Sequence, residues 1–350
     1  DKVPDMDEIE KRRWISEVLF LKAYYLYYLV RMYGPIPIVN ESLPINASVD
    51  EVRVMRSPVD SCFNFITTLL DDSYENLPLT IYNPQEDLGR ITKPIALALK
   101  AKVLVTAASP LFNGNTDQSK LVNPDGTPLF NPTFSKAKWD SAAVACKRAI
   151  DICHQVGNKL YYYRQEFQQH QLTDTIITQM SIRNSVCDKW NDEIIWANTQ
   201  SIVSGLQSLA NPTVNLNHLD NFAVRGELSP PLKIAEIFYT ENGVPISEDK
   251  TWDYGNRYTL RVAEYGDKLY VREGYTTAAL NFEREPRYYA SLGFDGGVWY
   301  GHGVYDDSND KNLYYVMAKK RQPSARQADR STVTGFFIKK LIHFETQVTG

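Results

Sequence analysis

The stretch from Trp14 to Asn40, WISEVLFLKAYYLYYLVRMYGPIPIVN, constrains the fold more than any other part of the chain. Apolar side chains recur every three or four residues along two separate stripes of one helix, and this spacing keeps each stripe on one side. The stripes are Trp14, Val18, Leu21, Tyr25, Tyr28 and Met32, and Ile15, Leu19, Leu26, Leu29 and Tyr33. Gly34 and Pro35 then end the helix, because glycine accepts left-handed dihedrals and proline cannot continue the turn. The pattern predicts a helix that is packed on both sides.

Three further helices are predicted in the first half of the chain. They begin at Ser57, Thr92 and Ser135, each of which can cap a helix, and each is followed by apolar residues at helical spacing. Taken as two antiparallel pairs, the four helices predict a tetratricopeptide-like stack over residues 1–157. Residues 158–350 have a different residue pattern, with polar loops and short β-like runs such as 193–197. We therefore expect a mainly α protein whose second half is irregular and loop-rich, with both parts forming one compact unit.

Composition excludes several classes of protein. The 38 basic and 42 acidic residues give a net charge of −4 without a long run of one sign, which argues against a nucleic-acid partner. No stretch approaches the roughly 20 apolar residues of a membrane helix. The four cysteines, at positions 62, 146, 153 and 187, have no metal-type spacing, and we expect them to be buried free thiols.

A search for catalytic and metal-binding patterns finds little. The chain has no G-x-S-x-G, H-E-x-x-H, GK[ST] or G-x-G-x-x-G motif, and its five histidines have no regular ligand spacing. The run Asp306-Asp307-Ser308-Asn309-Asp310 is rich in oxygen ligands but lacks the glycine and distal glutamate of a known calcium loop, so a solvated turn is favoured. We expect no cofactor, no metal and no enzyme activity. The 42 acidic residues allow many carboxylate pairs, so a glycoside hydrolase stays open as an alternative.

Several motifs, in order, carry a resemblance to a known family. LKAYYLYYLV followed by RMYGPIPIV, and GRITKPIALALKAKVLVTAASPLFNG over 89–114, resemble two helices of the SusD/RagB family. Later segments, PPLKIAEIFY (230–239), REPRYY (284–289, with Glu285 in place of the family's Asp) and GFFIKK (335–340), also resemble family elements. SusD/RagB proteins are surface lipoproteins that present nutrients to outer-membrane transporters in Bacteroidetes.

The resemblance implies a SusD-like fold and a lipid-anchored, outward-facing protein of the cell outer membrane. It also implies an oligosaccharide or polysaccharide ligand and a SusC-like TonB-dependent transporter as partner. The family's secretion signal, lipid-bearing cysteine and last helix pair do not appear in this sequence, so we expect a chain truncated at both ends. An all-helical glycoside hydrolase, a helical-repeat scaffold for protein partners and a peptide-binding SusD homologue remain alternatives.

The candidate binding residues are aromatic rings in the irregular half, where stacking on the apolar face of a sugar would explain their exposure. Trp252, Tyr254, Arg257 and Tyr258 lie in TWDYGNRY; Trp299 and Tyr300 lie in the glycine-rich FDGGVWYGHG. Trp190, beside Asn191 and Asp192, is a third candidate. The alternative for each ring is that it plugs a loop onto the core. No binding residue can be carried over from a family motif, and the identity of the ligand is open.

Overall fold

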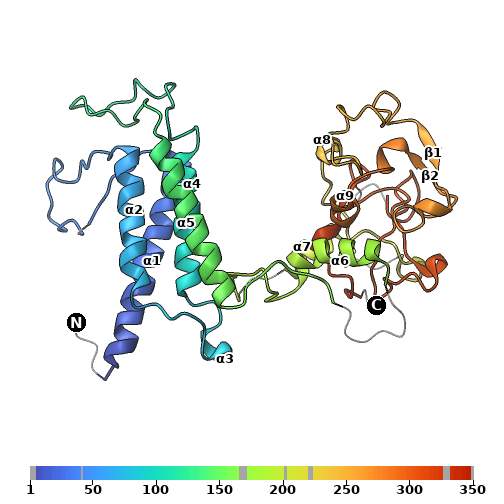
Figure 1. Cartoon of the computed structure of the whole chain (residues 1–350), viewed down its shortest axis with the longest axis horizontal. Helices are drawn as coiled ribbons and strands as arrows, with labels where there is room; N and C mark the ends of the chain where they lie inside the picture. The colour runs from blue at the N-terminus through green and yellow to red at the C-terminus, as the bar shows by residue number, and fades with distance from the viewer. Residues whose placement is uncertain are drawn as a thin grey trace. The chain divides into compact units, whose positions relative to one another are not determined.

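A computed structural model describes residues 5–40, 42–164, 172–200, 203–219, 224–325 and 332–347. The chain divides into two compact units (Figure 1). Unit 1 consists of Asp1–Lys159 and Ile194–Thr199, and unit 2 consists of Leu160–Glu193 and Gln200–Gly350. The described elements are mostly helical with very short strands, which confirms the predicted mainly α class. None of the helices in these ranges is long and apolar enough to cross a membrane.

Unit 1 is a stack of long helices whose axes lie side by side (Figure 1). Helix α1 packs on α2, α2 on α4, and α4 on α5. The bounds are α1 Glu8–Tyr33, α2 Val59–Tyr74, α3 Pro84–Asp87, α4 Lys93–Ala108 and α5 Lys136–Gln155. The four predicted helices are therefore confirmed. Gly34 ends α1 with a positive φ of 71°, and its N–H donates to the Val30 carbonyl, as its sequence position indicated.

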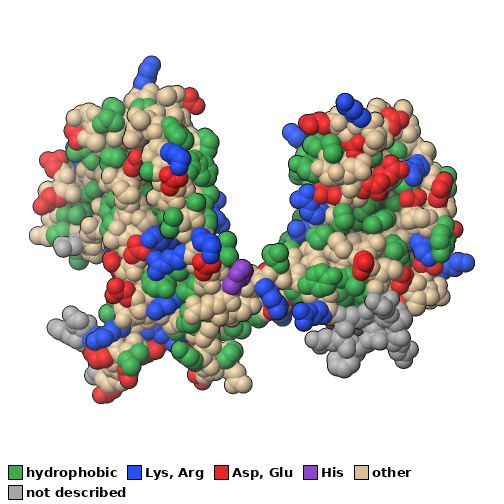
Figure 2. Space-filling view, in the orientation of Figure 1, with side chains coloured by type: hydrophobic (Ala, Val, Ile, Leu, Met, Phe, Trp, Pro, Cys, Tyr) green, Lys and Arg blue, Asp and Glu red, His purple; other side chains and the backbone are tan. Residues whose placement is uncertain are grey.

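The buried face of α1 differs from both predicted stripes. Its buried residues are Ser16, Phe20, Ala23, Tyr27 and Val30, whereas Trp14, Val18, Tyr25, Tyr28 and Met32 of the first stripe are exposed. Ser16 and Ala23 have small side chains, so a pattern built on large apolar residues does not include them. The expectation of packing on both sides is wrong for this structure. Figure 2 shows hydrophobic side chains interspersed with charges of both signs on the visible face of each unit.

A short segment of the second half belongs to unit 1 through Trp196. The indole Nε1 donates to the Gly89 carbonyl at 3.0 Å, and the ring meets Phe20 and Tyr24 edge-on, each with a centroid separation of 5.5 Å. Nearby, Arg90 bonds Glu10 and Glu17 of α1 and also Asp87. The predicted β-like run 193–197 forms no strand, because its aromatic residue packs on helices instead.

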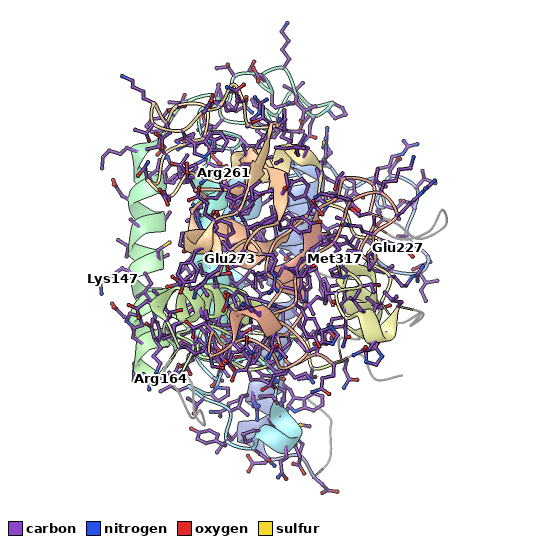
Figure 3. All side chains as sticks on the ribbon, turned by 90° about the vertical axis from the view of Figure 1, so that its right-hand side faces the viewer. Lys147, Arg164, Glu227, Arg261, Glu273 and Met317 are labelled. Carbon is purple, nitrogen blue, oxygen red and sulfur yellow. The ribbon has the colours of Figure 1, made fainter. Side chains whose placement is uncertain are left out.

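Unit 2 is built from short elements joined by irregular chain. Its helices are α6 Asp174–Cys187, α7 Ser204–Ala210, α8 Leu232–Ile237 and α9 Pro286–Ser291. Its strands are β1 Leu260–Val262, β2 Thr276–Ala278, β3 Leu292–Gly293 and β4 Phe337–Ile338. Strands β1 and β2 pair antiparallel, with Arg261, labelled in Figure 3, opposite Thr277. Strands β3 and β4 also pair antiparallel, and the 3-10 helix η5, Lys339–Leu341, follows β4 directly.

Two buried arginines and one buried lysine hold this irregular unit together. Arg183 donates to the carbonyls of Trp299, Tyr300 and Ile342, and Arg284 donates to those of Ala235, Phe238, Tyr239 and Leu280. Lys339 Nζ donates to the carbonyls of Tyr289 at 2.7 Å and Val298 at 2.8 Å. Buried carbonyls outside regular ladders need such donors, since an unpaired one costs about 1–3 kcal/mol.

Replacing Trp196 tests whether residues 194–199 are anchored to unit 1. We expect Trp196→Ala to lower the free energy of unfolding by about 2 kcal/mol, because two ring contacts and one hydrogen bond are lost. Trp196→Phe keeps the ring and should lose about 1 kcal/mol. Urea denaturation followed by far-UV circular dichroism measures both. The control is Trp139→Ala on α5, since that ring is similarly exposed, 42% against 38%. Equal effects of Trp196→Ala and Trp139→Ala would contradict the anchoring.

Replacing Lys339 tests the buried amine. Burial holds the pKa of Lys339 well below its usual range, and the positive charge of Arg183 lowers it further. The unfolded chain therefore binds a proton that the folded chain has lost, so stability rises with pH until the unfolded lysine also loses its proton. Between pH 8 and 10 we expect the wild-type free energy of unfolding to gain up to about 1.4 kcal/mol per pH unit relative to Lys339→Met.

Urea denaturation at pH 8, 9 and 10 checks this difference. The control is Lys320→Met, since that lysine is exposed and should leave the wild-type pH dependence unchanged. If the free energy of unfolding changes with pH in the same way for wild type and Lys339→Met, a neutral buried amine is contradicted.

Candidate functional site

Arg257 organises a cluster in unit 2 in which two exposed tyrosines meet a half-buried ion pair. Its guanidinium carbon lies 4.0 Å from the ring centroid of Tyr254 and 4.4 Å from that of Tyr258. Its Nε donates to Glu236 Oε1 at 2.8 Å, and the Tyr258 hydroxyl donates to the same oxygen. We call Tyr254, Arg257, Tyr258 and Glu236 the Arg257 cluster.

Local chain geometry brings these four residues together. Asn256 donates from its backbone and its side chain to Asp253, which closes a turn between the two tyrosines. Thr259 N–H then donates to the Asn256 carbonyl, and the chain continues into β1. Glu236 comes from the last turn of α8, 21 residues before Arg257. The cluster thus joins a turn to a helix end.

The electrostatics of the cluster are those of a hydrogen-bonded ion pair. The Tyr258 hydroxyl and then the Arg257 guanidinium hold the pKa of Glu236 below its usual range. The same contact with Glu236 raises the pKa of Tyr258. The carboxylate therefore stays charged at neutral pH and fixes the guanidinium over the rings, which gives the surface a preformed shape.

The arrangement suits a ligand that has an apolar face and polar edges. Arg257 lies over one face of each ring, while Tyr254 and Tyr258 remain 37% and 49% exposed. A pyranose could stack on such a ring and take hydrogen bonds from the neighbouring charged groups. Of the residues that the sequence singled out, the structure brings together Tyr254, Arg257 and Tyr258.

Trp252 lies beside this cluster in sequence but points into the core. It is 8% exposed, and its indole Nε1 donates to the Phe282 carbonyl at 3.2 Å. The Arg284 guanidinium lies 5.7 Å from its ring centroid. The expectation that this ring is displayed in a loop is corrected, because a hydrogen bond and a buried cation hold it inside.

Trp299 and Tyr300 are also buried, each 1% exposed. A Cβ at Gly293 or Gly301 would come within 2.5 or 2.6 Å of the Trp299 ring, so these glycines make room for the indole. Tyr300 donates its hydroxyl to the Leu269 carbonyl at 2.7 Å. The expectation that these two rings are exposed for a ligand is corrected, because the glycines let the core close around Trp299.

Trp190 lies in the turn after α6 and is 40% exposed, with a positive φ of 52°. Within the described residues, no ring contact joins it to the Arg257 cluster. Its role as a ligand contact stays a prediction. Glu236 is the residue of the cluster that the sequence did not indicate, since no local spacing connects it with Arg257.

The described residues offer little for metal or acid–base chemistry. They contain no group of three or more His, Cys, Asp or Glu side chains that could hold a metal ion. In the acidic run, Asp306 accepts a hydrogen bond from the backbone N–H of Ser308, as in a turn. His343 Nε2 lies 2.6 Å from Asp188, but its Nδ1 accepts from the Glu345 N–H, so neither ring nitrogen is a free base.

Two protein-family models match parts of the chain. A family model described as "SusD family" matches residues 192–350, and one described as "Starch-binding associating with outer membrane" matches residues 2–105. No curated protein matches the chain at a significant level.

The chain is also similar to solved structures. The structure of BT4246 is 26% identical with a TM-score of 0.74, and the match covers 95% of this chain and 57% of that one. A SusD-like protein from Bacteroides fragilis, 20% identical, has the same fold with a TM-score of 0.61 over 98% of this chain and 53% of that one. The chain thus spans little more than half the length of these structures. With its motifs, its helical fold and both family models in agreement, the chain is a member of the SusD/RagB family.

Proposed function

We propose that this chain is part of a non-catalytic glycan-binding protein that captures oligosaccharides at the outer membrane and delivers them to a SusC-like TonB-dependent transporter. The observation that carries the proposal is the exposed Arg257 cluster in a member of the SusD/RagB family. The description of the second family model, which names starch binding and the outer membrane, supports the ligand class and the location.

The chemistry of the cluster supports capture rather than cleavage. The cluster carries one carboxylate, Glu236, and both a cation and a hydroxyl bind its Oε1. Glycoside hydrolysis requires two carboxyl groups on either side of the bond, one of them with a raised pKa. The pKa of Glu236 is lowered, so this group is poorly suited to act as a general acid.

The two units would have different tasks in this proposal. The Arg257 cluster of unit 2 would bind the sugar by stacking and hydrogen bonds, while the helices of unit 1 would contact the transporter. A hinged motion of the whole protein over the transporter would then release the oligosaccharide into it. A lipid anchor would hold the protein at the cell surface, facing outward.

Isothermal titration calorimetry against maltoheptaose, cellohexaose, laminarihexaose and xylohexaose, with product analysis of each mixture, tests the proposal. We expect saturable binding of at least one glycan without product. Tyr254→Ala and Tyr258→Ala should each weaken that binding about tenfold, because a stacking ring contributes about 1 kcal/mol or more. Tyr82→Ala is the matched control, since this ring is 82% exposed and lies in unit 1. Cleavage of a glycan, or unchanged affinity in both cluster variants, would contradict the proposal.

A second test addresses the preformed shape of the cluster. Tyr258→Phe removes the hydroxyl that contributes most to lowering the pKa of Glu236, so we expect that pKa to rise toward its usual range. Carboxyl-detected NMR titration measures it. Tyr254→Phe is the control, because Tyr254 bonds the cluster through its backbone carbonyl and not through its hydroxyl. An unchanged Glu236 titration in Tyr258→Phe would show that the hydroxyl does not hold the carboxylate.

A further inference from the structure

A second surface feature of unit 2 has none of the predicted site residues in its lining. It is an open groove of about 510 Å³ between α8, α9, β4 and α6. Its lining is mostly aliphatic or proline, with Ile182, Pro230, Pro231, Ile234, Phe238, Leu292 and Ile338. We call this the Pro230 groove. The volume is within the range of small-molecule sites, about 300–1,000 Å³.

The lining differs from that of a sugar site. Phe238 is the one aromatic ring among the lining residues, so the walls are aliphatic and lack flat, exposed rings for stacking. Pro230 and Pro231 form part of the wall, and their fixed φ angles make it rigid before a ligand arrives. Ile234 stays 37% exposed at the groove, so part of the aliphatic wall faces solvent. These walls suit an aliphatic body.

The charged groups at the groove are both cations, Arg287 and Lys340. The charge of Arg287 is compensated by an ion pair, because its guanidinium binds Glu285 Oε2 at 2.6 Å. Glu236, the carboxylate of α8, is bound by Arg257. Lys340 has no ion-pair partner among the described residues. The groove therefore presents one uncompensated positive charge beside an aliphatic wall.

Ser291 adds a hydrogen-bonding group to the same wall. Its residue is 7% exposed, it lines the groove, and no hydrogen bond engages its hydroxyl within the described part of the chain. A hydroxyl and an unpaired cation that line the same groove are groups from which one carboxylate can take hydrogen bonds.

We propose that the Pro230 groove binds an amphiphilic anion, namely an aliphatic chain that ends in a carboxylate. The aliphatic chain lies against Ile182, Ile234 and Ile338, and the carboxylate meets Lys340 and Ser291. This site is separate from the glycan function proposed above and does not depend on it.

Displacement of 1-anilinonaphthalene-8-sulfonate, an apolar anion with a fluorescence signal, tests the site on the full chain. Decanoate and the neutral decanol, both below their aggregation concentrations, serve as competitors. We expect saturable binding of the probe and displacement by decanoate at an at least tenfold lower concentration than by decanol, about the effect of one favourable charge contact.

Variants then assign the binding to the groove. Lys340→Gln should weaken decanoate about tenfold and leave decanol unchanged. Ile234→Asp places a negative charge in the wall and should abolish displacement by decanoate. Lys233→Gln is the control, because it removes an exposed charge of the same sign from α8 outside the lining and should bind decanoate like wild type.

Three outcomes would overturn the proposal. These are equal displacement by decanol and decanoate, wild-type decanoate affinity in Lys340→Gln, or absence of saturable binding by the folded wild-type protein. Far-UV circular dichroism of each variant confirms folding. If Ile234→Asp does not fold, the Lys340→Gln result alone decides.

Discussion

The irregular half of this protein depends on hydrogen bonds from the buried side chains of two arginines and one lysine to backbone carbonyls. A unit with very short strands leaves many buried carbonyls without a ladder partner, and each needs a donor. Arg183 supplies these donors from α6, Arg284 from the residue before the N-cap of α9, and Lys339 from the start of η5. Such side chains reach several carbonyls at once, which a neutral hydroxyl cannot do. Two of the three, Arg284 and Lys339, lie in the REPRYY and GFFIKK segments that carried the family resemblance, so those motifs have a structural role here.

These hydrogen bonds determine which aromatic rings stay exposed and can contact a ligand. The three buried basic side chains pack against the rings of Trp252, Trp299 and Tyr300. The Arg183 guanidinium lies 5.5 Å from the Trp299 ring centroid, and Lys339 Nζ lies 5.2 Å from that of Tyr300. Rings at the unit's surface are held differently, by an ion pair with solvent on one side, as in the Arg257 cluster. The glycine-rich segment that carries Trp299 and Tyr300 is therefore part of the core. The candidate surface is a turn bound to the end of α8.

The sequence predicted the helices of unit 1 well, because caps, prolines and apolar spacing act locally. It predicted less about which faces pack, since Ser16 and Ala23 are buried while large rings such as Tyr25 are exposed. Glycines around Trp299 illustrate a second limit, since a glycine that admits a ligand and one that admits an indole look the same in sequence. Likewise, Glu236 meets Arg257 only through the fold. That both halves form one compact unit stays a prediction, as does ligand contact by Trp190.

The central claim is that glycan capture uses the exposed Arg257 cluster rather than the buried rings of the glycine-rich loop. Amide hydrogen exchange with and without a bound oligosaccharide tests it most directly. The account predicts new protection in peptides that cover residues 253–262 and 232–238, with no change at 298–301. Protection confined to 298–301 or to 188–192, with none at 253–262, would contradict it and would move the ligand to Trp299 or Trp190.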